Sequence, residues 1–143
     1  MPIPIRATVT IAAPPETIYP MLADLTRHNE WSKADLDIAK SGDGTYVSNT
    51  KFMGKPVQAT LRTVTDEPST RYVFDVQEPK HTTRHEFVLT PSGGGTEVER
   101  TMLIPDDGNA VQRFLVRALF GPTAIKSDMA ASLKKLKATV EAH

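Results

Sequence analysis

The chain has 143 residues, a length that suits one domain able to bury its own core. Lysine plus arginine and aspartate plus glutamate both number 17, so the formal net charge is zero and the long-range attraction typical of nucleic-acid-binding proteins is missing. The absence of cysteine excludes disulfides, thiolate nucleophiles and cysteine-based zinc sites. We therefore expect one domain over residues 1–143, with no nucleic acid among its partners.

The location of the protein is indicated by what the sequence lacks. The N-terminal segment Met1–Arg6 has neither the basic region nor the unbroken apolar run of a signal peptide. No stretch approaches the length needed to span a bilayer. We expect a soluble cytoplasmic protein without stable membrane insertion, either a monomer or a homodimer.

The first elements are a strand and two short helices. Strict alternation of apolar and polar residues over Ile3–Ile11 predicts a half-buried strand. Pro14-Pro15-Glu16 then suits the first turn of a helix, which Pro20 keeps short or kinked. A second short helix is expected over Thr26–Trp31, with Thr26 as its N-cap.

Six further strands are expected, because alternating stretches are separated by short turns containing glycine or proline. They are Leu36–Ser41, Thr45–Met53, Val57–Asp66, Arg71–Gln77, His81–Thr90 and Thr96–Ile104. Gly93-Gly94-Gly95 joins two strands and opens no helix, so it indicates a hairpin loop rather than a phosphate-binding loop. Together these features predict an antiparallel meander.

A long C-terminal helical stretch completes the chain. It is expected to open at Asp106-Asp107-Gly108-Asn109, with Asp107 or Asn109 as N-cap, and to be kinked or interrupted at Gly121-Pro122. Beyond that point its apolar stripe consists of Ile125, Met129, Leu133, Leu136 and Val140. The fold class is therefore α+β, a twisted antiparallel sheet whose concave face is partly covered by this helix.

Four segments carry a resemblance to a known family. They are Val9–Tyr19, Ala23-Asp24-Leu25 with Trp31, Glu67–Tyr72 and Leu89–Val98. With them the chain resembles the START-like, or SRPBCC, superfamily over nearly its whole length, and within it the polyketide cyclase/dehydrase-like group. The resemblance implies a helix-grip fold, in which a curved sheet of about seven strands wraps around a long helix beside a deep hydrophobic cavity.

The resemblance also implies a range of functions. Members bind lipids, sterols, polyketides or other aromatic compounds, and a minority catalyse cyclisation, dehydration or hydrolysis. The superfamily has no universal catalytic motif, so no catalytic residue can be assigned from the resemblance, and fold-level similarity alone does not give function.

Neither a metal site nor a cofactor site is expected. His81 and His85 fall in one predicted strand, where residues four apart stand about 13 Å from each other, too far to share a metal ion. No Walker loop, dinucleotide fingerprint or nucleophile elbow occurs in the sequence.

The candidates for a polar anchor are His85 and Arg100. Alternation places Arg100 and Met102 on the inward face of the last strand, and His85 and Phe87 on the inward face of the strand before it. There they are weak candidates for catalysis, or they orient the polar end of an apolar ligand. The alternative is that Arg100 forms a structural ion pair with Glu86 or another acid, or reaches solvent at the sheet edge.

The remaining candidate ligand-binding residues are mostly apolar. Trp31, the sole tryptophan, is either a stacking surface at the pocket mouth or a core plug beneath the short helices. Tyr72, Phe74 and Phe87 are either pocket wall or plain core. The start of the last helix is apolar beyond a single stripe, which suggests cavity lining, a lid or a dimer contact, unless nearby loops cover it. Its candidates are Val111, Phe114, Leu115 and Ala118.

The expected function is the binding or carriage of a hydrophobic small molecule, such as a lipid, polyketide or aromatic compound, in an internal cavity. One alternative is a cyclase/dehydrase-type enzyme acting on such a ligand, because that chemistry depends largely on shaping a reactive chain in a dry pocket and leaves little trace in sequence. Another is a protein-interaction module with a filled core. The sequence does not decide whether the chain is an enzyme.

Overall fold

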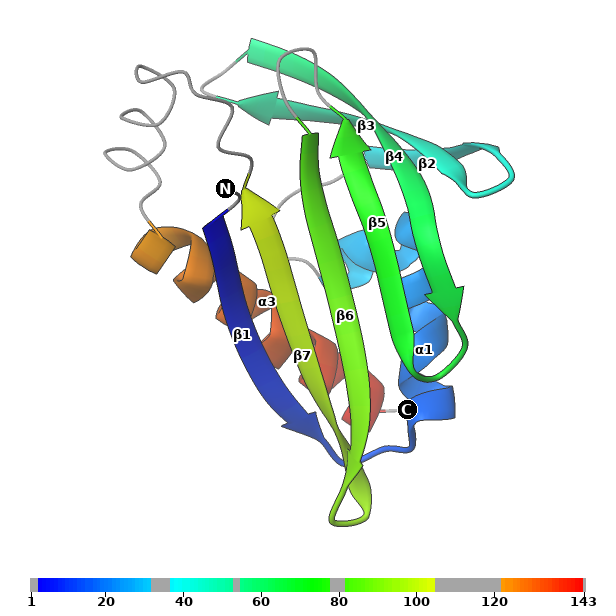
Figure 1. The fold of residues 1–143 in the computed structure, drawn as a ribbon, viewed down its shortest axis with the longest axis vertical. Helices are drawn as coiled ribbons and strands as arrows, with labels where there is room; N and C mark the ends of the chain where they lie inside the picture. Colours follow the sequence, from blue (N-terminus) through cyan, green and yellow to red (C-terminus); the bar gives the residue numbers. More distant parts are fainter. Residues whose placement is uncertain (1–2, 32–36, 53–54, 78–81, 105–121, 143) are drawn as a thin grey trace.

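The computed structural model describes residues 3–31, 37–52, 55–77, 82–104 and 122–142. Within these ranges seven strands form one antiparallel sheet in the order β1-β7-β6-β5-β4-β3-β2. The strands are β1 (Ile3–Ile11), β2 (Asp37–Gly42), β3 (Thr45–Phe52), β4 (Lys55–Glu67), β5 (Arg71–Gln77), β6 (Thr82–Ser92) and β7 (Gly95–Ile104). The sheet is curved and its helices all lie on one side, as a helix-grip fold requires (Figure 1).

The predicted strands are confirmed in number and order. The largest differences in their bounds are two residues, at the start of β4, predicted at Val57 and found at Lys55, and at the end of β6, predicted at Thr90 and found at Ser92. The strands after β1 follow one another as a meander, and β1 closes the array by pairing with β7. The two most distant strands of the sequence are therefore neighbours in the sheet.

The turn between β6 and β7 explains the run of three glycines. Ser92 pairs with Gly95, so Gly93 and Gly94 form a two-residue turn with φ values of 54° and 86°, a region in which glycine is favoured. A Cβ atom at Gly95 would lie 2.4 Å from the carbonyl oxygen of Ile11. The prediction of a hairpin loop is thus confirmed, and the third glycine lets β1 approach β7.

Two short helices follow β1. The α-helix α1 (Pro15–Ala23) has proline in its first turn, as expected, and the 3₁₀ helix η1 covers Leu25–Glu30. The prediction that Thr26 caps the second helix is wrong, because Asp24 is the N-cap and its Oδ1 accepts from the Thr26 backbone N–H at 3.1 Å. The Thr26 hydroxyl donates to the same oxygen at 2.6 Å.

The C-terminal helix α3 (Pro122–Glu141) packs against β1. Its described part begins at Pro122, and the predicted interruption at Gly121-Pro122 and the predicted caps Asp107 and Asn109 involve residues outside the described ranges. Its buried stripe is Met129, Leu133, Leu136 and Val140. Near its end Glu141 accepts from the Ala12 backbone N–H at 2.8 Å, which ties the helix to the end of β1. No helix in the described ranges has the length and apolarity that a membrane span needs.

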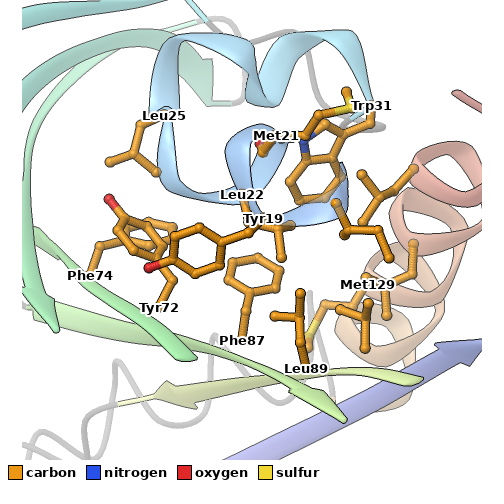
Figure 2. Packing of buried hydrophobic residues seen from close by; sticks show 14 of the residues in the cluster. Tyr19, Met21, Leu22, Leu25, Trp31, Tyr72, Phe74, Phe87, Leu89 and Met129 are labelled. Carbon is orange, nitrogen blue, oxygen red and sulfur yellow. Dashed lines mark hydrogen bonds between the residues drawn. The ribbon is translucent and has the colours of Figure 1, made fainter. Parts of the chain in front are cut away.

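The core lies between the concave face of the sheet and the three helices. Figure 2 shows the rings of Phe74 and Phe87 over the sheet, with Trp31 above them and Met129 of α3 to one side. At one border the Tyr19 hydroxyl of α1 donates a hydrogen bond to the Asp66 carboxylate of β4. Burial, followed by this hydrogen bond, raises the pKa of Tyr19. The contact joins α1 to β4, three strands away from β7 in the sheet order.

A histidine lies inside this core. His28 is 4% exposed, and its Nε2 lies 2.7 Å from the carbonyl oxygen of Leu22. Because a carbonyl can only accept, Nε2 carries the hydrogen and donates. Burial is the main cause that lowers the pKa of His28 to about 4, and the positive charge of Arg100 acts in the same direction. The folded protein therefore holds His28 neutral.

The first prediction concerns acid stability. Since protonation of His28 is disfavoured in the folded state, its stabilising contribution is fully present above about pH 6.5 and is lost as the pH falls toward about 4, by roughly 3 kcal/mol in all. We expect urea unfolding of His28→Gln to show a smaller fall in the free energy of unfolding over this range than the wild type. Equal falls in the two proteins would contradict this account of the buried imidazole.

The second prediction concerns the link between α1 and β4. Tyr19→Phe should lower the free energy of unfolding by about 1 kcal/mol, because it removes the donor to Asp66 and leaves the ring in place. Asp66→Asn is the matched variant: it keeps an acceptor oxygen and should lose less. If Tyr19→Phe unfolds at the wild-type urea concentration, the hydrogen bond contributes no stability.

Candidate functional site

The candidate site lies on the concave side of strands β6 and β7. Phe87 faces Arg100 in the strand register, and His85 faces Met102. Arg100 Nη2 lies 3.3 Å from His85 Nδ1 and donates a hydrogen bond to it. The prediction that His85 and Arg100 are adjacent on one face is confirmed.

The guanidinium of Arg100 lies among aromatic rings. Its central carbon is 5.3 Å from the ring centroid of Phe87 and 5.8 Å from that of Trp31, both within the range of a cation–π interaction. Its Nε atom is buried and has no hydrogen-bond partner in the described structure. Burial lowers the pKa of Arg100 to about 10, so the side chain remains a cation at neutral pH.

The ion pair considered between Arg100 and Glu86 is not formed. Glu86 points to the opposite face of β6 from His85 and Phe87, and its carboxylate pairs with Arg71 at 2.5 Å. No carboxylate in the described ranges lies within the 4.0 Å of a salt bridge to Arg100. Since β7 lies between β1 and β6, Arg100 is not at a sheet edge, although its side chain is only half-buried.

His85 is buried and neutral. Its ring stacks on Phe74 with centroids 4.9 Å apart and planes 4° from parallel. Burial is the main cause that lowers the pKa of His85 well below its ordinary value, and the charge of Arg100 lowers it further. Because arginine can only donate, His85 Nδ1 must be the acceptor and Nε2 must carry the hydrogen. In this state His85 is a hydrogen-bond donor through Nε2, and its basic nitrogen is occupied.

The aromatic candidates are core residues that also surround the Arg100 side chain. Trp31 is 1% exposed and its Nε1 donates to the Met21 carbonyl at 3.2 Å, so the indole N–H is already satisfied. The other aromatic candidates, Phe87, Phe74 and Tyr72, are also buried. Tyr72 packs on Phe74, with ring centroids 5.9 Å apart. This favours the core interpretation of Trp31, while its contact with Arg100 leaves it in the wall of the candidate site.

Of the other candidate ligand-binding residues, only Met102 lies in the described ranges. Met102 is half-buried and packs against the core beside His85. Val111, Phe114, Leu115 and Ala118 lie outside the described residues, so their expected role in lining the site stays a prediction. Within the described ranges no three histidine or acidic side chains gather as a metal-binding group.

One member of the group was missed by the sequence analysis. The ring of His28 lies 4.7 Å from Trp31 and 6.0 Å from Phe87, centroid to centroid. The signal was present, since Leu25, His28 and Trp31 are three residues apart and a 3₁₀ helix aligns such positions on one face.

Solved structures of similar fold come from several bacteria. TTHA0849 from Thermus thermophilus is 24% identical with a TM-score of 0.74, and the match covers 98% of each chain. CV1439 from Chromobacterium violaceum is 20% identical, with a TM-score of 0.73 over 96% of this chain and 97% of the other. The Aha1 dimer from Colwellia psychrerythraea is 18% identical, with a TM-score of 0.67 over 97% and 96%. At these identities the likeness shows the fold.

Comparison of the sequence with curated proteins gives no match. A family model described as "Polyketide cyclase / dehydrase and lipid transport" matches residues 2–141. The match covers the whole described sheet and the three described helices. The chain therefore belongs to the polyketide cyclase/dehydrase and lipid transport family, of SRPBCC type.

Proposed function

We propose that this protein binds and carries a hydrophobic small molecule against the concave face of its sheet, with Arg100 and His85 at the polar end of the ligand. The family description, which joins lipid transport to cyclase/dehydrase chemistry, supports a ligand of this kind. The observation that carries the proposal is a half-buried cation among aromatic rings, with no described carboxylate as partner.

The surroundings of Arg100 suit an apolar body. The half-buried thioether of Met102 supplies an adaptable apolar surface beside His85, and the buried rings of Trp31, Phe74 and Phe87 pack behind it. Binding sites for small molecules commonly combine such apolar walls with a few polar groups that fix orientation. The described part of the concave face offers that combination around one arginine.

Arg100 is costly to the fold as it stands. Removing a cation from water is unfavourable unless a partner compensates for the lost hydration, and an unmet N–H adds to that cost. The contacts with Phe87, Trp31 and neutral His85 compensate only in part. A ligand that supplies a hydrogen-bond acceptor would compensate for the remaining unfavourable free energy. The burial of Arg100 therefore lowers the stability of the free protein but favours ligand binding.

A cyclase/dehydrase-type activity is the second candidate function, favoured by the family description and by His85. With Nδ1 occupied by Arg100, His85 is suited to donate from Nε2 to a carbonyl oxygen of a bound chain. Arg100→Ala and His85→Ala separate the two functions once a ligand is known. Lost turnover with retained binding indicates catalysis, whereas parallel loss indicates recognition alone.

The third prediction tests occupancy of the concave face. Met102→Trp adds bulk beside His85 and should weaken binding of the neutral fluorescent probe N-phenyl-1-naphthylamine by about tenfold. The reason is that loss of the apolar area buried at this position lowers the binding free energy by about 1–2 kcal/mol. Val64→Trp is the matched control, since Val64 is 45% exposed. It should bind the probe as the wild type does.

Two outcomes would contradict the proposal. The first is a wild-type protein that does not bind the probe and carries no small molecule in native mass spectrometry after purification. The second is equal affinity for the probe in both tryptophan variants, which would place the probe elsewhere on the protein. Thermal melts should accompany the titrations, so that a folding defect in Met102→Trp is recognised.

A further inference from the structure

The arginines of this chain differ in how their Nε atoms are satisfied. Arg27, Arg71 and Arg84 each donate from Nε to a carboxylate, at 3.2, 2.5 and 2.8 Å. Arg84 donates in addition from Nη2 to the second oxygen of Asp75, at 3.1 Å, which completes a two-pronged pair. Arg100 is the more deeply buried side chain, yet its Nε has no described acceptor. In the other three arginines the acceptor at Nε is a carboxylate.

The charge around Arg100 is also unbalanced. His28 and His85 are neutral, and no carboxylate in the described ranges pairs with the guanidinium. The described cluster thus carries one net positive charge among aromatic rings. A water molecule could accept from Nε but would leave this charge uncompensated. One carboxylate would both accept the Nε–H hydrogen bond and neutralise the charge.

We infer that the ligand is a monocarboxylate with an apolar body, and that its carboxylate accepts from Arg100 Nε–H while the body lies beside the half-buried Met102. The inference rests on the proposed function and adds the charge and headgroup of the ligand. A carboxylate is favoured over a neutral carbonyl because it removes the net charge of the cluster. It is favoured over a phosphate dianion because a single negative charge balances the one net positive charge of the described cluster.

His85 has a positioning role in this arrangement. By accepting from Nη2, it holds one edge of the guanidinium and leaves Nε to the ligand. Because His85 is itself oriented by stacking on Phe74, the direction of the Nε–H bond is set by groups that make no contact with the carboxylate.

The experiment compares two probes of equal length that differ in charge, dodecanoate and dodecanamide, at pH 8 and 0.15 M salt. Binding is followed by the fluorescence of Trp31, the sole tryptophan, which lies 5.8 Å from the guanidinium. We expect the wild type to bind dodecanoate about ten- to a hundredfold more tightly, the range given by a charge-assisted hydrogen bond. Screening at this salt concentration suppresses attraction by distant surface charges.

Variants of Arg100 and Arg84 test which residue is responsible for the preference for dodecanoate. Arg100→Met should bring the two affinities to within about threefold of each other while dodecanamide still binds, and Arg100→Gln serves the same purpose if the methionine variant does not fold. Arg84→Met is the matched control, because Arg84 lies on the opposite face of the sheet in an exposed pair, and it should keep the wild-type ratio.

The outcomes separate this inference from the proposed function. Equal wild-type affinities for the two probes overturn the inference and leave the proposed function standing. A carboxylate preference that survives the Arg100 variants also overturns it, because the charge is then recognised elsewhere. If neither probe binds the wild type while N-phenyl-1-naphthylamine also fails to bind, the proposed function is lost and the inference with it.

Discussion

The arrangement of the concave face depends on one interaction, the burial of the Arg100 guanidinium against Phe87 and Trp31 with neutral His85 as its polar partner. Burial is the main cause that lowers the pKa of both His28 and His85, and the charge of Arg100 lowers both further, so the neighbouring histidines stay neutral. The buried guanidinium also leaves a donor unmet in an apolar setting. The fold tolerates this cost in free energy, which is consistent with our proposal that Arg100 binds a ligand.

The sheet creates this cluster through register and alternation. Pairing of Phe87 with Arg100 and of His85 with Met102 fixes which side chains meet, and a shift of one residue would turn Arg100 to the opposite face. The glycine turn at Gly93-Gly94 sets that register, and the close contact at Gly95 brings β1 against β7. The helices α1 and η1 then place Trp31 above the pair. Local turn chemistry thus determines the geometry of the candidate site.

Most of the sheet could be predicted from sequence, because period-two alternation and glycine or proline turns are local signals. The inward direction of His85 and Arg100 followed from the same alternation. The hydrogen-bond partner of Arg100 could not be predicted in this way, because alternation gives the face of each residue but not the position of the end of a long side chain. The cap at Asp24 and the role of His28 were missed, because a 3₁₀ helix shifts both the cap position and the spacing of buried residues.

The most direct measurement is the proton–nitrogen NMR signal of the Arg100 Nε–H group, observed while dodecanoate is added. Our account predicts that this signal moves to lower field as the carboxylate replaces a missing acceptor, while that of Arg84, already paired with Asp75, stays in place. Backbone signals of β6 and β7 should move with it. Binding that shifts those backbone signals but leaves the Arg100 Nε–H signal unchanged would contradict the account.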